Sequence, residues 1–293
     1  MKKIVVVIAL VIIFYEQANA KEKQGKVTPE ENIAALIEGA KNGNPNAMGL
    51  LGIGSLQGKH CENDEKEGIR LLTLAANAGD LNSQEFLGSI YLYPDTMLSE
   101  GGVEQDLKEA EKWMRAASEQ GRHIGLALVG GGYANVKKYD QALQLFKDGA
   151  KLNDPRAQLY MGTSYREGWG VNIDHKEALK WYLKAAKNGE TESQVRLGGI
   201  YTSGTGVVKN EEESMRWYLA AASQGDMYGQ VNVALKFLAG SGGLKHRNPS
   251  KALKYLSLAA QQNSKRACII IKRMQTNSDG PKEEILKALS YCS

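Results

Sequence analysis

The stretch Ala157-Gln-Leu-Tyr-Met-Gly-Thr-Ser-Tyr165 recurs, with variation, from one end of this 293-residue chain to the other. In its fullest form it is followed by Gly168-Trp-Gly-Val171 and by Lys176-Glu-Ala-Leu-Lys-Trp-Tyr-Leu-Lys-Ala-Ala-Lys-Asn-Gly189. Glycine or asparagine closes the copies at Gly43, Gly79, Gly121, Asn153, Gly189, Gly225 and Asn263, with gaps of 36, 42, 32, 36, 36 and 38 residues. Repetition at this period is typical of stacked structural repeats.

Each copy has two halves with the spacing of α-helices. The first half places a small residue, an apolar residue, a glycine and an aromatic residue at offsets 0, +4, +5 and +8, as in Ala157, Met161, Gly162 and Tyr165. These offsets share one helix face, where small residues let a neighbouring helix approach. The second half ends at Gly or Asn, which favour the left-handed turn after a helix. We therefore predict six helix pairs between about residues 45 and 263.

These units resemble Sel1-like repeats, relatives of tetratricopeptide repeats with a longer turn between their helices. The Gly-x-Gly-Val of that turn stands here as Gly168-Trp-Gly-Val171 and Gly204-Thr-Gly-Val207. The resemblance covers roughly residues 28–275 and implies an all-α fold, a right-handed α-solenoid or superhelix of about six full repeats. A helix opened by Thr28-Pro-Glu-Glu31, and helices at 265–275 and 281–290, are predicted to cap the two ends. Residues 21–293 would then form one continuous domain of about fourteen helices.

The first twenty residues have the pattern of a Sec signal peptide. Lys2-Lys3 precede an apolar run from Ile4 to Phe14, and the segment ends in Ala18-Asn-Ala20, a cleavage site for signal peptidase. The apolar run is too short to span a bilayer. We expect an exported bacterial protein that is periplasmic or secreted after cleavage near Ala20, without stable membrane insertion.

Composition and cysteine usage limit the classes of function. Without residues 1–20 the chain has 35 basic and 32 acidic residues, a charge of +3, which gives no reason to expect a nucleic-acid partner. The cysteines are Cys61, Cys268 and Cys292. A Cys268–Cys292 disulfide would pin the C-terminal helices, and the sequence leaves equally open that it does not form. Cys61 is interpreted as a bystander thiol.

The sequence contains no motif for catalysis or for a cofactor. H-E-x-x-H, C-x-x-C, G-x-S-x-G, S-x-x-K and the phosphate-binding loop are all missing. The four histidines, His60, His123, His175 and His246, lie in different repeats, so no metal site is predicted. Trp-Tyr pairs at 181/182 and 217/218 could suggest a ligand cage, but their recurrence at the repeat period favours packing. We predict no cofactor and no enzymatic activity.

The turn between the two helices of a unit varies in length. From the aromatic position of the first helix, which is Ser55 in the first unit, to a small residue of the second helix, the separation is 13 in the first, fourth and fifth units. It is 19 in the second, 9 in the third and 15 in the sixth. The third unit therefore resembles a plain tetratricopeptide hairpin, whereas the second carries an insertion within 93–102. A binding loop and a tolerated surface insertion explain that length equally well.

The tetratricopeptide pattern, anchored on the glycine of each first helix, predicts which side chains line a concave, partner-binding face. The predicted residues are Asn82, Glu85, Ser89, Tyr93, Arg156, Thr163, Arg166, Glu192, Thr202 and Tyr228, and the same pattern also places Leu92, Leu159, Val195 and Gly199 on this face. In the sixth unit the same positions hold Val231, Leu235 and Leu238. These three either anchor a partner or pack against the terminal helices, and we favour packing.

A continuous repeat surface without a reactive site favours a non-enzymatic protein that binds a protein partner, for which a secreted toxin is one candidate. Among exported proteins of the resembled family, the favoured hypothesis is an immunity protein that neutralises a phospholipase-type effector of type VI secretion in the periplasm. The alternatives are a secreted virulence or host-interaction factor and a periplasmic envelope scaffold. A β-lactamase or penicillin-binding enzyme is a remote alternative, because the serine-lysine motif and the cysteines in every repeat are missing. The sequence does not identify the partner or the oligomeric state.

Overall fold

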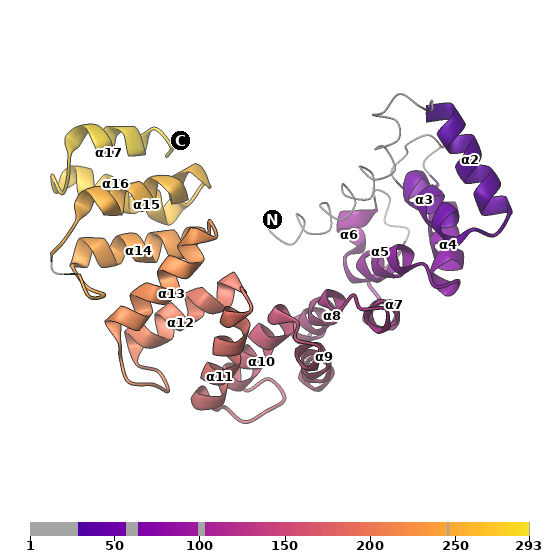
Figure 1. Cartoon of the computed structure of the whole chain (residues 1–293), viewed down its shortest axis with the longest axis horizontal. Helices are drawn as coiled ribbons and strands as arrows, with labels where there is room; N and C mark the ends of the chain where they lie inside the picture. The colour runs from indigo at the N-terminus through magenta and orange to yellow at the C-terminus, as the bar shows by residue number, and fades with distance from the viewer. Residues whose placement is uncertain (1–28, 57–63, 99–102, 245, 293) are drawn as a thin grey trace. The chain divides into compact units, whose positions relative to one another are not determined.

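A computed structural model describes residues 29–56, 64–98, 103–244 and 246–292 (Figure 1). Within these ranges all regular secondary structure is α-helical, and the fold is an all-α solenoid of stacked helix pairs. The predicted signal peptide, residues 1–20, lies outside the described residues, as do His60 and Cys61.

The six predicted helix pairs are confirmed. They are α3 (Pro45–Leu56) with α4 (Glu65–Asn77), α5 (Leu81–Leu92) with α7 (Leu107–Glu119), α8 (Ile124–Asn135) with α9 (Tyr139–Lys151), α10 (Pro155–Glu167) with α11 (His175–Lys187), α12 (Thr191–Ser203) with α13 (Glu211–Ser223), and α14 (Met227–Ala239) with α15 (Pro249–Gln261). Helix α2 (Pro29–Lys41) precedes them, and α16 (Lys265–Thr276) and α17 (Lys282–Leu289) follow. The insertion in the second repeat holds a further short helix, α6 (Pro94–Met97), that the sequence does not predict.

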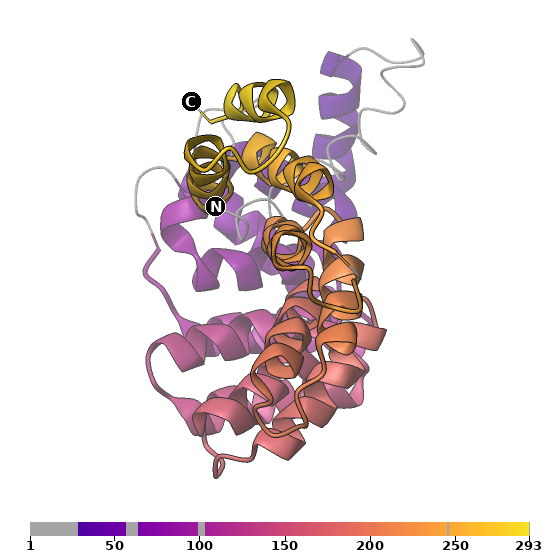
Figure 2. The same ribbon diagram turned by 90° about the vertical axis from the view of Figure 1, so that its left-hand side faces the viewer.

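The helices group into two compact units. The first ends at Gly149 and the second begins at Ala150, so the border falls within α9, the second helix of the third repeat. In the second unit, helices that follow one another along the chain are also neighbours in space, from α10 to α17 (Figures 1 and 2).

Small residues bring the two helices of a pair into close contact. A Cβ atom added to Gly162 of α10 would lie 2.7 Å from ring carbons of Tyr182 on α11. In the next repeat a Cβ on Gly198 would lie 2.5 Å from the ring of Tyr218. Tyr182 is fully buried and Tyr218 nearly so. These tyrosines of the Trp-Tyr pairs are therefore core residues, as their periodicity predicts, and do not form a ligand cage.

One backbone hydrogen bond closes the turn inside almost every repeat. The residue that caps the second helix donates its N–H to the carbonyl oxygen of the first helix's aromatic residue. The N···O distances are 3.0 Å for Asp106 to Tyr91, 2.9 Å for Lys138 to Tyr133, 2.8 Å for Asp174 to Tyr165, 2.9 Å for Asn210 to Tyr201 and 2.8 Å for Asn248 to Phe237. The loop therefore connects two residues that this hydrogen bond holds together, and the two helices are joined in the same way whatever the length of the loop.

Helix caps explain the residues that flank this bond. In the fourth and fifth repeats the first helix ends at Gly168 and Gly204, whose φ angles of 77° and 78° favour glycine. The second helix begins after Asp174 or Asn210, and each of these side chains accepts two backbone N–H groups of the first turn. These contacts satisfy donors that an uncapped helix start leaves without partners.

Pairs of amide side chains, which sequence reasoning missed, join the two helices within each of four repeats; in each pair the member on the first helix is buried and the member at the end of the second helix is exposed. Gln224 at the end of α13 donates to Gln194 Oε1 of α12 at 2.9 Å, and Gln194 donates to the carbonyl oxygen of Ala186 in the preceding repeat. The corresponding pairs are Gln84 with Gln120, Gln158 with Asn188, and Gln230 with Gln262. Since the spacing between the members is 30 to 36 residues, comparing equivalent positions of the repeats could have found them.

Candidate interaction surface

The predicted partner-binding residues fall into a buried and an accessible group. Ser89 and Thr163 are buried, contrary to the prediction that they line a face. The Ser89 hydroxyl donates to the Glu85 carbonyl oxygen one turn earlier at 2.9 Å. Thr163 donates likewise to Leu159, and its hydroxyl lies 3.2 Å from the Tyr182 hydroxyl. The prediction overestimated their exposure because it placed helix positions without accounting for how deeply each first helix packs against the second.

In the first unit, the buried Glu85 carboxylate pairs with Arg122, whose side chain is 35 % exposed. The Glu85 side chain is 8 % exposed, and Oε2 lies 2.9 Å from Nη1 of Arg122, in the turn before α8, without the alignment of a hydrogen bond. Burial raises the pKa of the Glu85 carboxyl, and the positive charge of Arg122 opposes that shift. Asn82 on α5 and Tyr93, the residue between α5 and α6, are both half-buried. Glu85 therefore holds two repeats together and offers little surface to a partner.

The second unit presents a band of charge along its first helices. Arg156 of α10 lowers the pKa of Glu190, although burial of that carboxyl is the larger effect and raises it. Burial also raises the pKa of Tyr160, against the nearby positive charge of Arg156. Glu192 forms an ion pair with Arg196 one turn later on α12. The band contains both positive and negative side chains, which can form hydrogen bonds and ion pairs with another protein.

Arg166 is only partly satisfied within the chain. It pairs with Glu167 through Nη2 at 2.7 Å, whereas its buried Nε atom has no hydrogen-bond partner among the described residues. An unpaired buried donor is costly, on the order of 1–3 kcal/mol. The buried Nε cannot contact a partner directly, but the Arg166 side chain as a whole is 34 % exposed, so its outer edge is accessible.

The remaining predicted positions lie between α12 and α14. Thr202 donates to the Gly198 carbonyl oxygen at 2.8 Å and contacts Ser214, and the buried Lys236 ammonium donates to it at 3.1 Å. Lys236 also pairs with Glu211, so this polar cluster is closed within the fold. Tyr228, in the first turn of α14, is 56 % exposed. Thr202 is thus tied down, whereas Tyr228 is accessible.

The apolar residues of the sixth repeat pack against the terminal helices. Val231, Leu235 and Leu238 belong to the same hydrophobic core as residues of α15, α16 and α17, such as Ile271 and Ile285. The packing interpretation favoured from the sequence is therefore confirmed, and these leucines are not a free anchor site.

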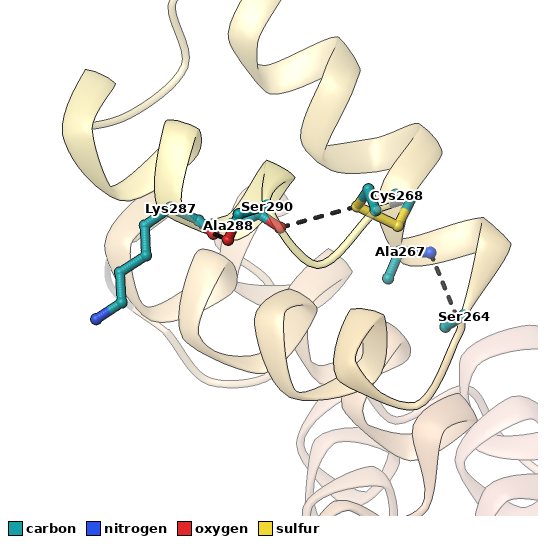
Figure 3. The surroundings of a disulfide bond; sticks show 7 residues. Ser264, Ala267, Cys268, Lys287, Ala288 and Ser290 are labelled. Atoms are coloured by element: carbon teal, nitrogen blue, oxygen red, sulfur yellow. Dashed lines mark hydrogen bonds between the residues drawn. A yellow bond between two sulfur atoms is a disulfide. The ribbon is translucent and has the colours of Figure 1, made fainter.

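A disulfide joins Cys268 of α16 to Cys292, just beyond the end of α17, with Cα atoms 5.5 Å apart (Figure 3). The sequence left this bridge open. The two cysteines are separated by 24 positions, and closing a loop of that size stabilises the fold by roughly 3 kcal/mol through the entropy of the unfolded chain. The bridge therefore fastens the last helix to the one before it.

In the described part of the chain, no group of three or more His, Cys, Asp or Glu side chains is arranged to hold a metal ion. His123 Nδ1 lies 3.0 Å from the Ser118 hydroxyl, His175 begins α11, and His246 lies in the turn before α15. A bilayer-spanning helix is likewise not found among these residues.

Family comparison agrees with the repeat geometry. The model of the Sel1 repeat matches residues 45–80, 82–121, 155–190, 191–226 and 228–264, which is more than half of the chain. The chain belongs to the Sel1 repeat family. Sel1-repeat proteins are generally non-enzymatic scaffolds, and their repeats mediate protein interactions. The third helix pair, α8 with α9, lies between the matched segments, consistent with its short turn.

Two solved Sel1-type structures are similar over most of the chain. A protective antigen present in uropathogenic Escherichia coli strains is 26% identical, with a TM-score of 0.69 over 89% of this chain. The match spans 56% of the length of that antigen. A Sel1 repeat protein from Oxalobacter formigenes is 26% identical, with a TM-score of 0.61 over 83% of this chain and 95% of its own.

Other comparisons add no functional weight. An immunity protein from Pseudomonas aeruginosa is 19% identical, with a TM-score of 0.42 over 63% of this chain and 68% of its own. A likeness at this level carries no argument about function. None of the curated proteins matches the chain.

Proposed function

We propose that this Sel1 repeat chain is an exported, non-enzymatic protein that binds a protein partner through the first helices of its second unit. The observation that carries the proposal is the group of charged side chains on α10 and α12, in which the side chain of Arg166 is 34 % exposed and pairs with the adjacent Glu167. Arginine is enriched at protein interfaces because its planar fork binds carboxylates and carbonyl oxygens with defined geometry.

The size of a repeat surface also supports this function. A stable protein interface buries on the order of 1,600 Å² in total, which adjacent repeats can supply without a lid or a cofactor. Tyr228 adds an exposed aromatic side chain on α14 in the same unit, and aromatic residues are enriched at interface centres.

Within this class, the specific function that we favour is an immunity protein that blocks a phospholipase-type effector of type VI secretion in the periplasm. Inhibition requires only a complementary surface, and a chain of stacked Sel1 repeats provides one. A second candidate, a factor exposed to a host, is favoured by the similarity to the E. coli protective antigen, which is 26% identical with a TM-score of 0.69.

A double charge reversal, Arg156→Glu with Arg166→Glu, tests the surface. The binding partner would be sought first in the product of the adjoining gene, because immunity proteins are generally encoded beside their toxins. By calorimetry we expect at least about a tenfold loss of affinity, equivalent to ~1.4 kcal/mol, with little change in melting temperature. The matched control is Lys176→Glu with Lys184→Glu, since both lysines are exposed on α11, the second helix of the same repeat.

Unchanged affinity in the α10 variant, or an equal loss in the α11 control, would move the interface elsewhere. Cell fractionation tests export, because a protein retained in the cytoplasm with residues 1–20 attached contradicts it. Hydrolysis of a chromogenic β-lactam by purified protein, abolished by one substitution, would contradict the non-enzymatic assignment.

A further inference from the structure

The positive charge of the chain is concentrated at its C-terminal end. Residues 249–293 contain eight lysine and arginine residues and three aspartate and glutamate residues, a charge of +5, whereas the whole chain carries +4. The rest of the chain is therefore close to neutral. A charge imbalance confined to one region raises the local concentration of anionic partners there.

Part of this charge surrounds a groove between α15 and α17. The groove has a volume of about 490 Å³ and is lined by Ser250, Lys251, Leu253, Lys254, Ser257, Leu258, Gln261, Glu284, Lys287 and Tyr291. This volume falls within the range of sites that bind small ligands or a few side chains, roughly 300–1,000 Å³. Helices α15 and α17 lie together in both views (Figures 1 and 2).

The lining combines an apolar part with uncompensated cations. Leu258 is 40 % exposed, at a position where the two preceding repeats have Ala220 and Lys184. Among the described residues, none of the ammonium groups of Lys251, Lys254 and Lys287 forms an ion pair. Lys251 lies over the ring of Phe237 at 5.6 Å, a contact that leaves its charge without a carboxylate. Three cations face one acidic side chain, Glu284, so the groove complements negative charge.

The disulfide holds one wall of the groove. Tyr291 lines the groove and directly precedes Cys292, whose sulfur is bonded to Cys268 of α16. Lys287, one helical turn before Tyr291, points away from the disulfide (Figure 3). Helix α17 is only eight residues long and has just two buried residues, Ile285 and Ala288. Because so short a helix has little core contact of its own, the bridge contributes much of what keeps this wall in place.

We propose that this groove is a second binding site, which takes an acidic peptide segment of a protein partner. Carboxylates of the segment pair with Lys251, Lys254 and Lys287, and one aliphatic or aromatic side chain packs against Leu258 and Tyr291. The Cys268–Cys292 disulfide keeps the wall formed by α17 in position, so that the oxidised protein binds more tightly than the reduced one. This site goes beyond the function proposed for α10 and α12, and different residues carry it.

The test uses a short fluorescein-labelled peptide of glutamate and leucine, titrated with the full chain and followed by fluorescence anisotropy. Two comparison peptides replace leucine by serine or glutamate by lysine. We expect the glutamate-leucine peptide to bind, with an affinity that falls as salt rises, and the lysine peptide not to bind. The serine peptide should bind more weakly, because it lacks the apolar side chain.

The decisive variant is Lys251→Glu, Lys254→Glu, Lys287→Glu, for which we expect at least about a tenfold loss of affinity. Its control is Lys265→Glu, Lys272→Glu, Lys282→Glu, which makes the same change in charge at exposed lysines of α16 and α17 outside the groove. Circular dichroism checks that both variants keep their helices. Equal binding by the two variants overturns the proposal, because it shows that net charge alone attracts the peptide.

Two further outcomes bear on the occupant and on the disulfide. If the wild-type chain binds vesicles that contain an anionic phospholipid but not the peptide, the cations face a membrane and the proposal fails. Cys268→Ser with Cys292→Ser should weaken peptide binding while leaving the affinity for the α10–α12 partner unchanged. Undiminished peptide binding by that variant contradicts the role of the bridge.

Discussion

In the fourth repeat Asp174 follows Tyr165 by nine positions, whereas in the third repeat Lys138 follows Tyr133 by only five. Both pairs make the same backbone hydrogen bond, at 2.8 and 2.9 Å. Both repeats also pack a glycine against an aromatic ring: a Cβ on Gly162 would approach Tyr182, and one on Gly130 would lie 2.5 Å from Phe146. The third repeat therefore keeps the packing of a helix pair and loses the loop by which the family is recognised.

The amide pair is present in only one of the same two repeats. The fourth repeat pairs Gln158 with Asn188 at 2.9 Å. At the equivalent positions the third repeat has Leu126 and Leu152, neither of which can donate a side-chain hydrogen bond. The comparison separates two layers of structure. Helix packing and turn closure are common to both repeats, whereas the long loop and the amide pair are additions that the third repeat lacks.

The largest expected effect tests the helix packing that the third and fourth repeats have in common. Tyr182→Ala and Phe146→Ala each remove a fully buried ring, and each should lower the free energy of unfolding by about 3–5 kcal/mol. Urea denaturation measures both. Tyr228→Ala, at an exposed ring, is the control and should change stability little. A loss in the third repeat less than half of that in the fourth would show that the two pairs are not equivalent in packing.

The next effect tests the amide pairs. Gln194→Leu removes the hydrogen bonds to Ala186 and Gln224, and it should cost about 1–2 kcal/mol, mainly because the buried Ala186 carbonyl oxygen loses its side-chain donor. Leu126→Gln in the third repeat should also destabilise, since it buries an amide where the repeat has leucine at the partner position. In a double-mutant cycle, Gln194→Leu with Gln224→Leu should cost less than the two single changes together. Strict additivity would mean that the pair is not coupled.

The smallest expected effect is a difference between the fourth and fifth repeats in how the stability contributed by their helix caps depends on pH. The backbone N–H groups of Glu177 and Lys176 hold the pKa of the Asp174 carboxyl below its ordinary value. A lowered folded-state pKa contributes stability that is present above the unfolded value, near 4, and is lost as pH falls through the folded value. Asn210 caps the next repeat with a side chain that does not titrate. Asp174→Asn should therefore flatten the acid side of the stability profile, and Asn210→Asp should steepen it, as measured by thermal melts below about pH 5.

This prediction would be contradicted if Asp174→Asn left the acid side of the stability-versus-pH profile unchanged. The exposed caps then contribute the same at every pH, and the difference between the two repeats has no electrostatic consequence.

The sequence predicts the fold closely because one signal is repeated many times. The helix pairs and the short third repeat follow from periodic Gly, Ala and aromatic residues, whereas the N-terminal helix was predicted from its capping sequence. The short helix α6 was missed because it falls inside an insertion without a counterpart in other repeats. The amide pairs were missed because each joins residues of two helices, which a pattern along a single helix does not show.

The candidate surface was predicted less well, for physical reasons. Helix register identifies the face on which a residue lies but does not determine its depth. The hydroxyls of Ser89 and Thr163 donate to backbone carbonyl oxygens one turn earlier in their own helices. The Glu85 carboxylate is buried against Arg122. The groove between α15 and α17 depends on where the last helix is fastened, which only the three-dimensional arrangement of Cys268 and Cys292 shows.

The backbone bond between the cap residue and the aromatic carbonyl leaves the intervening loop free to evolve. It closes spans of five, nine, eleven and fifteen positions in this one chain, counted from Tyr133, Tyr165, Phe237 and Tyr91 to their donors. Lineages can therefore lengthen or trim a loop by small insertions and deletions without rebuilding the helices that flank it. For protein engineers the same tolerance marks these loops as places to graft an epitope or an affinity handle.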